Sequence, residues 1–125
     1  MKIVWDLDGT LLKDSGKDYE KPAELTPLYQ LFNKLSGSMG LFNIVVTGRT
    51  ELPLNLKGCF DEVYCRDWIP EDWDKYYPLY FQWKVDTILA LKPDLVFDDD
   101  QQICRYLTKK GLNVVWTPQY AYMGA

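Results

Sequence analysis

The sequence predicts an α/β fold in which a five-stranded, mostly parallel sheet lies between helices in three layers, as in Rossmann-like proteins. Three observations predict it. Short apolar runs alternate with segments of helical periodicity, which is typical of parallel sheets covered on both faces. The 125 residues amount to about one domain. No linker or internal repeat divides them, so we expect residues 1–125 to form a single domain.

Each strand is predicted from a short apolar run, and each helix from apolar residues three or four positions apart. The predicted strands are Lys2–Trp5, Phe42–Val46, Glu62–Cys65, Leu95–Phe97 and Asn113–Trp116. The predicted helices cover residues 27–35, 50–56, 83–91 and about 100–110. Thr26 is the expected N-cap of the first helix, and Asp99 or Asp100 that of the last.

The composition excludes several classes of function. The chain contains no histidine, which removes Ser-His-Asp and Cys-His catalysis and imidazole-bound zinc. Its net charge of -4 argues against a protein that coats nucleic acid. No apolar run reaches the ~20 residues of a membrane span, and a charge comes too early for a signal peptide. With three cysteines and no CxxC, we expect reduced thiols in a cytoplasmic protein without membrane contact.

Polar residues follow three of the predicted strands, where parallel sheets bind their ligands. Asp6 and Asp8 follow the first strand, Thr47-Gly48-Arg49 the second, and Asp98-Asp99 the fourth. Lys84 is expected at the start of the helix that leads into the fourth strand. If these strands are neighbours, at least four carboxylates converge on one edge of the sheet.

Such a carboxylate cluster requires a cation. Two like charges ~4 Å apart repel by about 4 kcal/mol at the effective dielectric of a protein surface. An all-oxygen ligand set without histidine favours a hard ion. The sequence therefore predicts Mg²⁺ as cofactor, with the charge of Lys84 beside it.

In this order and placement, the residues resemble the motifs of the haloacid dehalogenase (HAD) superfamily of phosphohydrolases. The first motif is Asp6-Leu7-Asp8-Gly9-Thr10, and the others are Thr47, Lys84 and the pair Asp98-Asp99. The match spans nearly the whole chain. The segment from Lys84 to Gly111 is similar to polynucleotide 3'-phosphatase domains, although Asp100 stands where those domains usually carry arginine.

The resemblance implies a phosphomonoester hydrolase that acts through an aspartyl phosphate. Asp6 would be the nucleophile, and Asp8 would protonate the leaving oxygen and then activate water. Thr47 and the Gly48 amide would hold the phosphoryl oxygens. Lys84 would pair with both Asp6 and the phosphate.

The resemblance also implies a metal site. Asp6, the carbonyl of Asp8 and the Asp98/Asp99 pair would hold Mg²⁺, with one of that pair binding through water. For Arg49, two interpretations stay open, namely contact with the substrate phosphate and capping of a helix.

The spacing of the motifs bears on the substrate. Residues 11–46 and 66–83 are too short for the cap domain that many HAD proteins insert there, so we expect a capless protein. Its open site would take a bulky substrate or be covered by a partner subunit in a homodimer. The second gap is rich in aromatic residues, which could stack nucleobases or simply pack the loop. They are Trp68, Trp73, Tyr76, Tyr77, Tyr80, Phe81 and Trp83.

A nucleotide or a nucleic-acid end is therefore one candidate substrate. The alternatives are a 5'-nucleotidase or small-metabolite phosphatase, and a catalytically silent HAD-fold binding protein. The complete motif set argues against the silent protein. A dinucleotide-binding domain is excluded because no GxGxxG follows the first strand.

Overall fold

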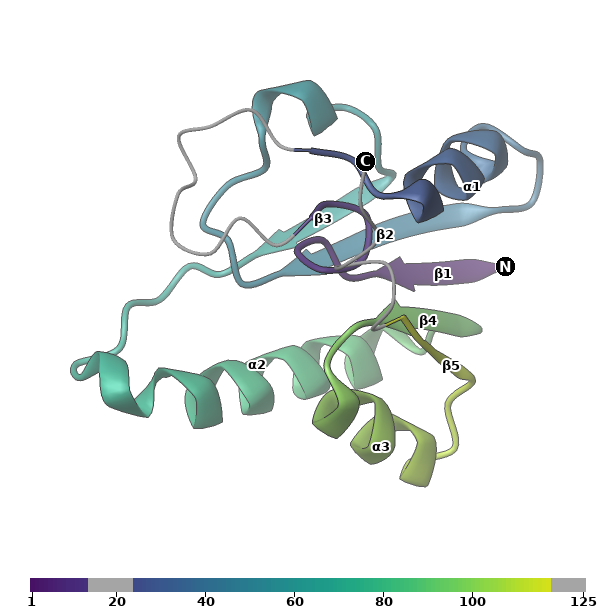
Figure 1. Ribbon diagram of the computed structural model, residues 1–125. Helices are drawn as coiled ribbons and strands as arrows, with labels where there is room; N and C mark the ends of the chain where they lie inside the picture. Colours follow the sequence, from purple (N-terminus) through teal and green to yellow (C-terminus); the bar gives the residue numbers. More distant parts are fainter. Residues whose placement is uncertain (14–23, 118–125) are drawn as a thin grey trace.

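The computed structural model describes residues 1–13 and 24–117, and these form one parallel sheet between two layers of helices (Figure 1). The strands lie in the spatial order β3-β2-β1-β4-β5. They are β1 (Lys2–Trp5), β2 (Phe42–Thr47), β3 (Glu62–Cys65), β4 (Leu95–Asp98) and β5 (Val114–Trp116). All four pairings are parallel, so every strand ends at the same edge. The predicted fold class is confirmed.

The helices cover both faces of the sheet. Helix α1 (Pro27–Leu35) lies on one face, and α2 (Tyr76–Leu91) and α3 (Gln101–Lys109) lie on the other (Figure 1). Two short 3₁₀ helices, η1 (Leu54–Leu56) and η2 (Trp73–Lys75), occur in the connections. Within the described ranges, no helix has both the length and the apolar character needed to cross a bilayer.

The alternation of side chains along β1 divides the core into two layers. Ile3 and Trp5 pack towards α1, whereas Val4 packs towards α2 and α3. The indole of Trp5 stacks on Phe97 with 4.4 Å between ring centroids. Its Nε1–H donates to Oδ1 of Asn43 at 3.0 Å, which satisfies the buried polar atom. Both faces of β1 are therefore covered, which places the end of this strand inside the molecule.

Two predicted helices differ from the observed ones. Helix α2 begins at Tyr76 rather than Trp83, and Pro78 falls in its first turn, where the missing N–H costs nothing. Lys84 consequently lies in the middle of α2 and not at its start. The predicted helix over residues 50–56 is wrong except for η1, because Pro53 interrupts it.

The structure also shows which residues lie at the predicted N-caps. Asp100 is the N-cap of α3, and its Oδ1 accepts from the N–H groups of Gln102 and Ile103 at 2.9 and 3.1 Å. Thr26 is the N-cap residue of α1, but its hydroxyl donates to the carbonyl of Thr10 instead of capping the helix. This contact ties α1 to the loop after β1.

Candidate active site

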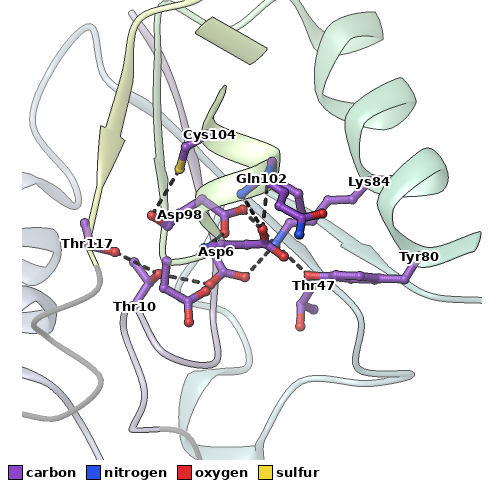
Figure 2. A network of polar contacts seen from close by, with 12 residues as sticks. Asp6, Thr10, Thr47, Tyr80, Lys84, Asp98, Gln102, Cys104 and Thr117 are labelled. Carbon is purple, nitrogen blue, oxygen red and sulfur yellow. Dashed lines mark hydrogen bonds and ion pairs between the residues drawn. The ribbon is translucent and has the colours of Figure 1, made fainter. Parts of the chain in front are cut away.

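Asp6 follows β1 directly and is buried at the centre of a polar network (Figure 2). Its Oδ1 accepts a hydrogen bond from Nζ of Lys84 at 2.6 Å. Its Oδ2 accepts one from the hydroxyl of Thr10 at 2.9 Å, and that hydroxyl lies 3.2 Å from the hydroxyl of Thr117. Both carboxylate oxygens are thus held in fixed directions by groups from opposite sides of the site.

Lys84 reaches this network from the middle of α2 with its side chain fully buried. Besides Asp6, its Nζ lies 2.9 Å from Oδ2 of Asp98 and 3.0 Å from the hydroxyl of Tyr80. Burial would lower the pKa of Lys84, but the adjacent carboxylates of Asp6 and Asp98 outweigh it and raise the pKa well above its usual value. Lys84 is therefore a permanent positive charge beside Asp6.

Three carboxylates form a cluster that could hold a metal ion. Asp6, Asp98 and Asp99 each offer one oxygen, and these oxygens lie within 4.8 Å of one another. Burial and the charge of Asp6 raise the pKa of Asp98 to about 7 and that of Asp99 to about 9. The cluster is therefore short of positive charge even with Lys84 in contact.

The donor set of the cluster fits a hard cation such as Mg²⁺. Oδ2 of Asp98 is buried and, within the described part of the chain, accepts no hydrogen bond, although it forms an ion pair with Lys84. A buried carboxylate oxygen left in this way costs free energy. A cation bound by oxygen ligands alone would satisfy it.

Gly9 allows the loop after β1 to approach Asp99 closely. Its φ is +85°, and a Cβ placed on it would lie 2.0 Å from Oδ2 of Asp99. Any side chain at this position would displace a candidate metal ligand. Glycine is therefore required at this position of the Asp-Gly-Thr sequence for steric reasons as well as for the turn.

Asp8 does not join the carboxylate cluster, which corrects the expectation that four carboxylates converge. Its side chain instead forms a bidentate ion pair with Arg49, with Nε to Oδ2 at 2.8 Å and Nη2 to Oδ1 at 2.7 Å. The Asp8 carboxylate is thus held by an arginine that follows β2, and a pocket shared by Asp6 and Asp8 stays a prediction. A metal contact through the carbonyl of Asp8 stays a prediction.

Thr47 is the last residue of β2, which lies next to β1 in the sheet, and the turn at Gly48 and Arg49 follows it. No helix begins there, so helix capping by Arg49 is excluded. The buried hydroxyl of Thr47 accepts from the N–H of Arg49 at 3.2 Å. A Cβ on Gly48 would lie 2.7 Å from the hydroxyl of Tyr76, so glycine lets this ring pack on the turn.

An aromatic cluster extends from this turn along the start of α2. Tyr76 and Tyr80 are stacked with 5.5 Å between centroids, and Tyr76 lies 5.6 Å from Trp73. The guanidinium of Arg66 lies over Trp68, Trp73 and Tyr76 at 5.4–5.6 Å. Most of these rings pack on one another, whereas Trp73 is 60% exposed. Packing therefore accounts for most of the cluster, and Trp73 is left as a surface that a ligand could contact.

Tyr80, Thr10 and Thr117 belong to the network, although the sequence does not predict them as site residues. Tyr80 lies one helical turn before Lys84, and a helix predicted to begin at Trp83 hides this spacing. Thr10 is part of the first motif, and its hydroxyl bonds Asp6 and lies near that of Thr117. Among the predicted residues, Asp6, Asp98 and Asp99 form the carboxylate cluster, and Lys84 contacts Asp6 and Asp98.

Comparison with known proteins supports the fold only. Neither protein-family models nor curated proteins match the sequence. Among solved structures, a chain of the Pnkp1/Rnl/Hen1 RNA repair complex is similar, with a TM-score of 0.65 and 18% sequence identity. The similarity covers 92% of this chain and 42% of that one. The present chain therefore spans less than half the length of this structural neighbour.

Proposed function

We propose that this protein is a Mg²⁺-dependent phosphomonoesterase that uses Asp6 as nucleophile. The observation that supports this proposal most directly is the buried Asp6 carboxylate, which lies between the Lys84 ammonium at 2.6 Å and the Thr10 hydroxyl at 2.9 Å. A cluster with Asp98 and Asp99 lies beside it. Phosphoryl transfer needs this combination, because the enzyme must position a nucleophile and stabilise developing negative charge.

Asp6, Asp98 and Asp99, with the Asp8 carbonyl, would hold the metal ion. Mg²⁺ supplies positive charge that offsets the repulsion between a carboxylate nucleophile and a phosphate dianion. Lys84 contributes a fixed positive charge to the same task from the α2 side. The Thr47 hydroxyl and the Gly48 amide would bind the phosphoryl oxygens from the β2 side.

The reaction takes two steps that share Asp8 as proton carrier. A carboxylate oxygen of Asp6 attacks phosphorus, the bond to the leaving oxygen breaks with its electron pair, and that oxygen takes a proton from the carboxyl group of Asp8. Water then attacks the aspartyl phosphate and gives a proton to Asp8. The bond between phosphorus and Asp6 breaks, which releases phosphate and restores the Asp6 carboxylate.

The proposed substrate is a nucleotide or a nucleic-acid end. Two observations favour it. One is the similarity in fold to a chain of an RNA repair complex, and the other is the exposed Trp73, which packs on Tyr76, whose hydroxyl reaches Gly48. A small-metabolite phosphatase would use the same carboxylate chemistry. A capless single domain and a homodimer stay predictions.

The first prediction concerns the nucleophile. Asp6→Asn should abolish phosphate release from p-nitrophenyl phosphate in Mg²⁺, because the amide cannot form the phosphoryl ester. Asp86→Asn, an exposed residue of the same helix as Lys84, is the matched control and should keep full activity.

Two results would contradict the proposal. Full activity of Asp6→Asn would remove the aspartyl-phosphate mechanism. A parent protein that binds Mg²⁺ and phosphate without releasing phosphate from any ester would instead be the catalytically silent binding protein.

A further inference from the structure

A bidentate ion pair joins Arg49 to Asp8, the residue to which the proposed function assigns proton transfer. Nε donates to Oδ2 at 2.8 Å, and Nη2 donates to Oδ1 at 2.7 Å. Two parallel contacts fix the plane of a carboxylate as well as its position. The Arg49 side chain is 9% exposed and that of Asp8 is 26% exposed. The arginine is thus largely enclosed, while the aspartate remains accessible to a ligand.

The backbone of Arg49 is anchored on both sides. Its N–H donates to the hydroxyl of Thr47 at 3.2 Å, and its carbonyl accepts from the N–H of Arg66 at 2.9 Å. Nε of Arg66 also donates to the carbonyl of Gly48 at 2.9 Å. These contacts join the turn after β2 to the end of β3, so the guanidinium of Arg49 extends from a fixed base.

Among the described residues, Lys84 and Arg49 contact different carboxylates. Lys84 contacts Asp6 and Asp98, whereas Arg49 contacts Asp8. Because the Asp8 carboxylate lies outside the acidic cluster, neither Lys84 nor a metal held by that cluster sets its direction. Its direction is set by Arg49.

We infer that Arg49 is a positioning residue that orients the Asp8 carboxyl group towards the leaving oxygen. This rests on the proposed phosphatase function and adds a role for Arg49 distinct from phosphate binding. When the bond between phosphorus and the leaving oxygen breaks, the electron pair stays on that oxygen, which takes the proton that Asp8 carries in its carboxylic acid form. The carboxylate left on Asp8 is the form that accepts both hydrogen bonds from Arg49. Arg49 acts through Asp8, so its loss impairs this proton transfer.

The test compares two substrates of nearly equal size, p-nitrophenyl phosphate and p-nitrobenzyl phosphate. The nitrophenolate leaves with little need for a proton, whereas the benzylic alkoxide requires one. The ratio of kcat/KM between them isolates protonation, because kcat/KM covers the steps up to the aspartyl phosphate and phosphate binding cancels in the ratio. Five variants are compared with the parent: Asp8→Asn, Arg49→Lys, Arg49→Gln, the double variant Arg49→Gln/Asp8→Asn and the control Arg105→Gln.

We expect both Arg49 variants to lose activity on the benzyl ester at least about 10-fold more than on the phenyl ester, within the range of general acid catalysis. Asp8→Asn should show the same selective loss. Arg49→Lys keeps the charge but not the two parallel contacts, so it shares the effect. The double variant Arg49→Gln/Asp8→Asn should discriminate no more than Asp8→Asn alone. Arg105 is exposed on α3, and its variant should match the parent.

Equal losses on both esters in the Arg49 variants would overturn the inference and make Arg49 a phosphate ligand only. Unchanged rates would overturn it as well. If the parent hydrolyses both esters and the Arg49 variants keep the parent's ratio of kcat/KM between them, the phosphatase function stands and the inference about Arg49 is wrong. If the parent hydrolyses neither, both fall. Melting curves of each variant confirm that it is folded, and Arg49→Lys carries the test where Arg49→Gln is unfolded.

Discussion

Three oxygen atoms surround the ammonium group of Lys84, two as hydrogen-bond acceptors and the Asp98 oxygen as an ion-pair partner. They belong to Asp6 at 2.6 Å, Asp98 at 2.9 Å and Tyr80 at 3.0 Å. A buried ammonium is costly unless it is paired and hydrogen-bonded. Of these three partners, Tyr80 alone is neutral, since burial raises the pKa of its hydroxyl well above the usual value. It therefore fixes the ammonium without cancelling charge that the proposed phosphate group needs.

Removal of the Tyr80 hydroxyl tests this role. Tyr80→Phe should lower the free energy of unfolding by about 2 kcal/mol, the typical loss of a hydrogen bond to a charged group. It should also lower kcat several-fold, because Lys84 is less firmly placed. Urea unfolding and phosphate release measure the two effects. Tyr106→Phe, on α3 and outside this network, is the control. A Tyr80→Phe protein as stable and active as the parent would show that Asp6 and Asp98 suffice to hold Lys84.

The sequence predicts some contacts of the site better than others. Asp6, Asp98 and Asp99 follow neighbouring strands of a parallel sheet, so their convergence is a consequence of topology. The pair between Asp8 and Arg49 is different, because it depends on the side-chain torsions of two loops 41 positions apart. Alternation along an extended chain suggested that Asp6 and Asp8 face the same way. That alternation describes one segment of the chain and gives no sign of the arginine that Asp8 contacts.

At the scale of elements, the strands were predicted within a residue or two, and the start of α2 was not. The strands are short apolar runs bounded by turn residues, which is a strong local signal. The first turns of α2 carry Tyr76, Tyr77, Tyr80 and Phe81. Aromatic side chains therefore lie nearly all round this part of the helix, and the sequence shows no amphipathic period there. Pro78 adds a misleading sign, since proline usually ends a helix but is tolerated in the first turn.

The start of α2 leads to a prediction on substrate recognition. Trp73 is exposed and contacts Tyr76, whose ring reaches Gly48 at the candidate phosphate site. Stacking of one base on such a side chain contributes about 1–3 kcal/mol, or roughly 5- to 150-fold in affinity. Asp72 and Asp74 flank Trp73, so we expect one base to be bound rather than a long strand whose phosphates these carboxylates would repel.

Trp73→Ala should therefore lower kcat/KM for a nucleoside monophosphate within this range and leave p-nitrophenyl phosphate nearly unchanged. Phe42→Ala is the control, because Phe42 is also partly exposed but begins β2, at the opposite edge of the sheet. Equal effects of Trp73→Ala on both substrates, or a sugar phosphate preferred by the parent, would count against stacking.

At the scale of the whole molecule, the absence of histidine simplifies the response to pH. Few groups titrate between pH 5 and 9 in such a chain. Burial raises the pKa of Cys104 to about 12, so this thiol does not titrate there. Asp98 and Asp99 do, because burial and the charge of Asp6 raise their pKa values to about 7 and about 9. The stability of the protein over this interval should therefore report on the carboxylate cluster.

The sign of this dependence follows from proton binding. Both carboxyl groups have an ordinary pKa of 3.8, so between pH 4 and 9 the folded protein binds more protons than the unfolded chain. In EDTA, the free energy of unfolding should then fall as pH rises from 5 to 9.

Mg²⁺ binds the deprotonated carboxylates and should raise the melting temperature more at pH 8 than at pH 5.5. A ligand at 100 times its Kd adds about 2.7 kcal/mol to the free energy of unfolding. Asp98→Asn/Asp99→Asn should reduce both the pH slope and the Mg²⁺ shift. A parent protein whose melting temperature ignores Mg²⁺ at pH 8, or whose double variant keeps the same response, would show that the cluster does not bind the ion.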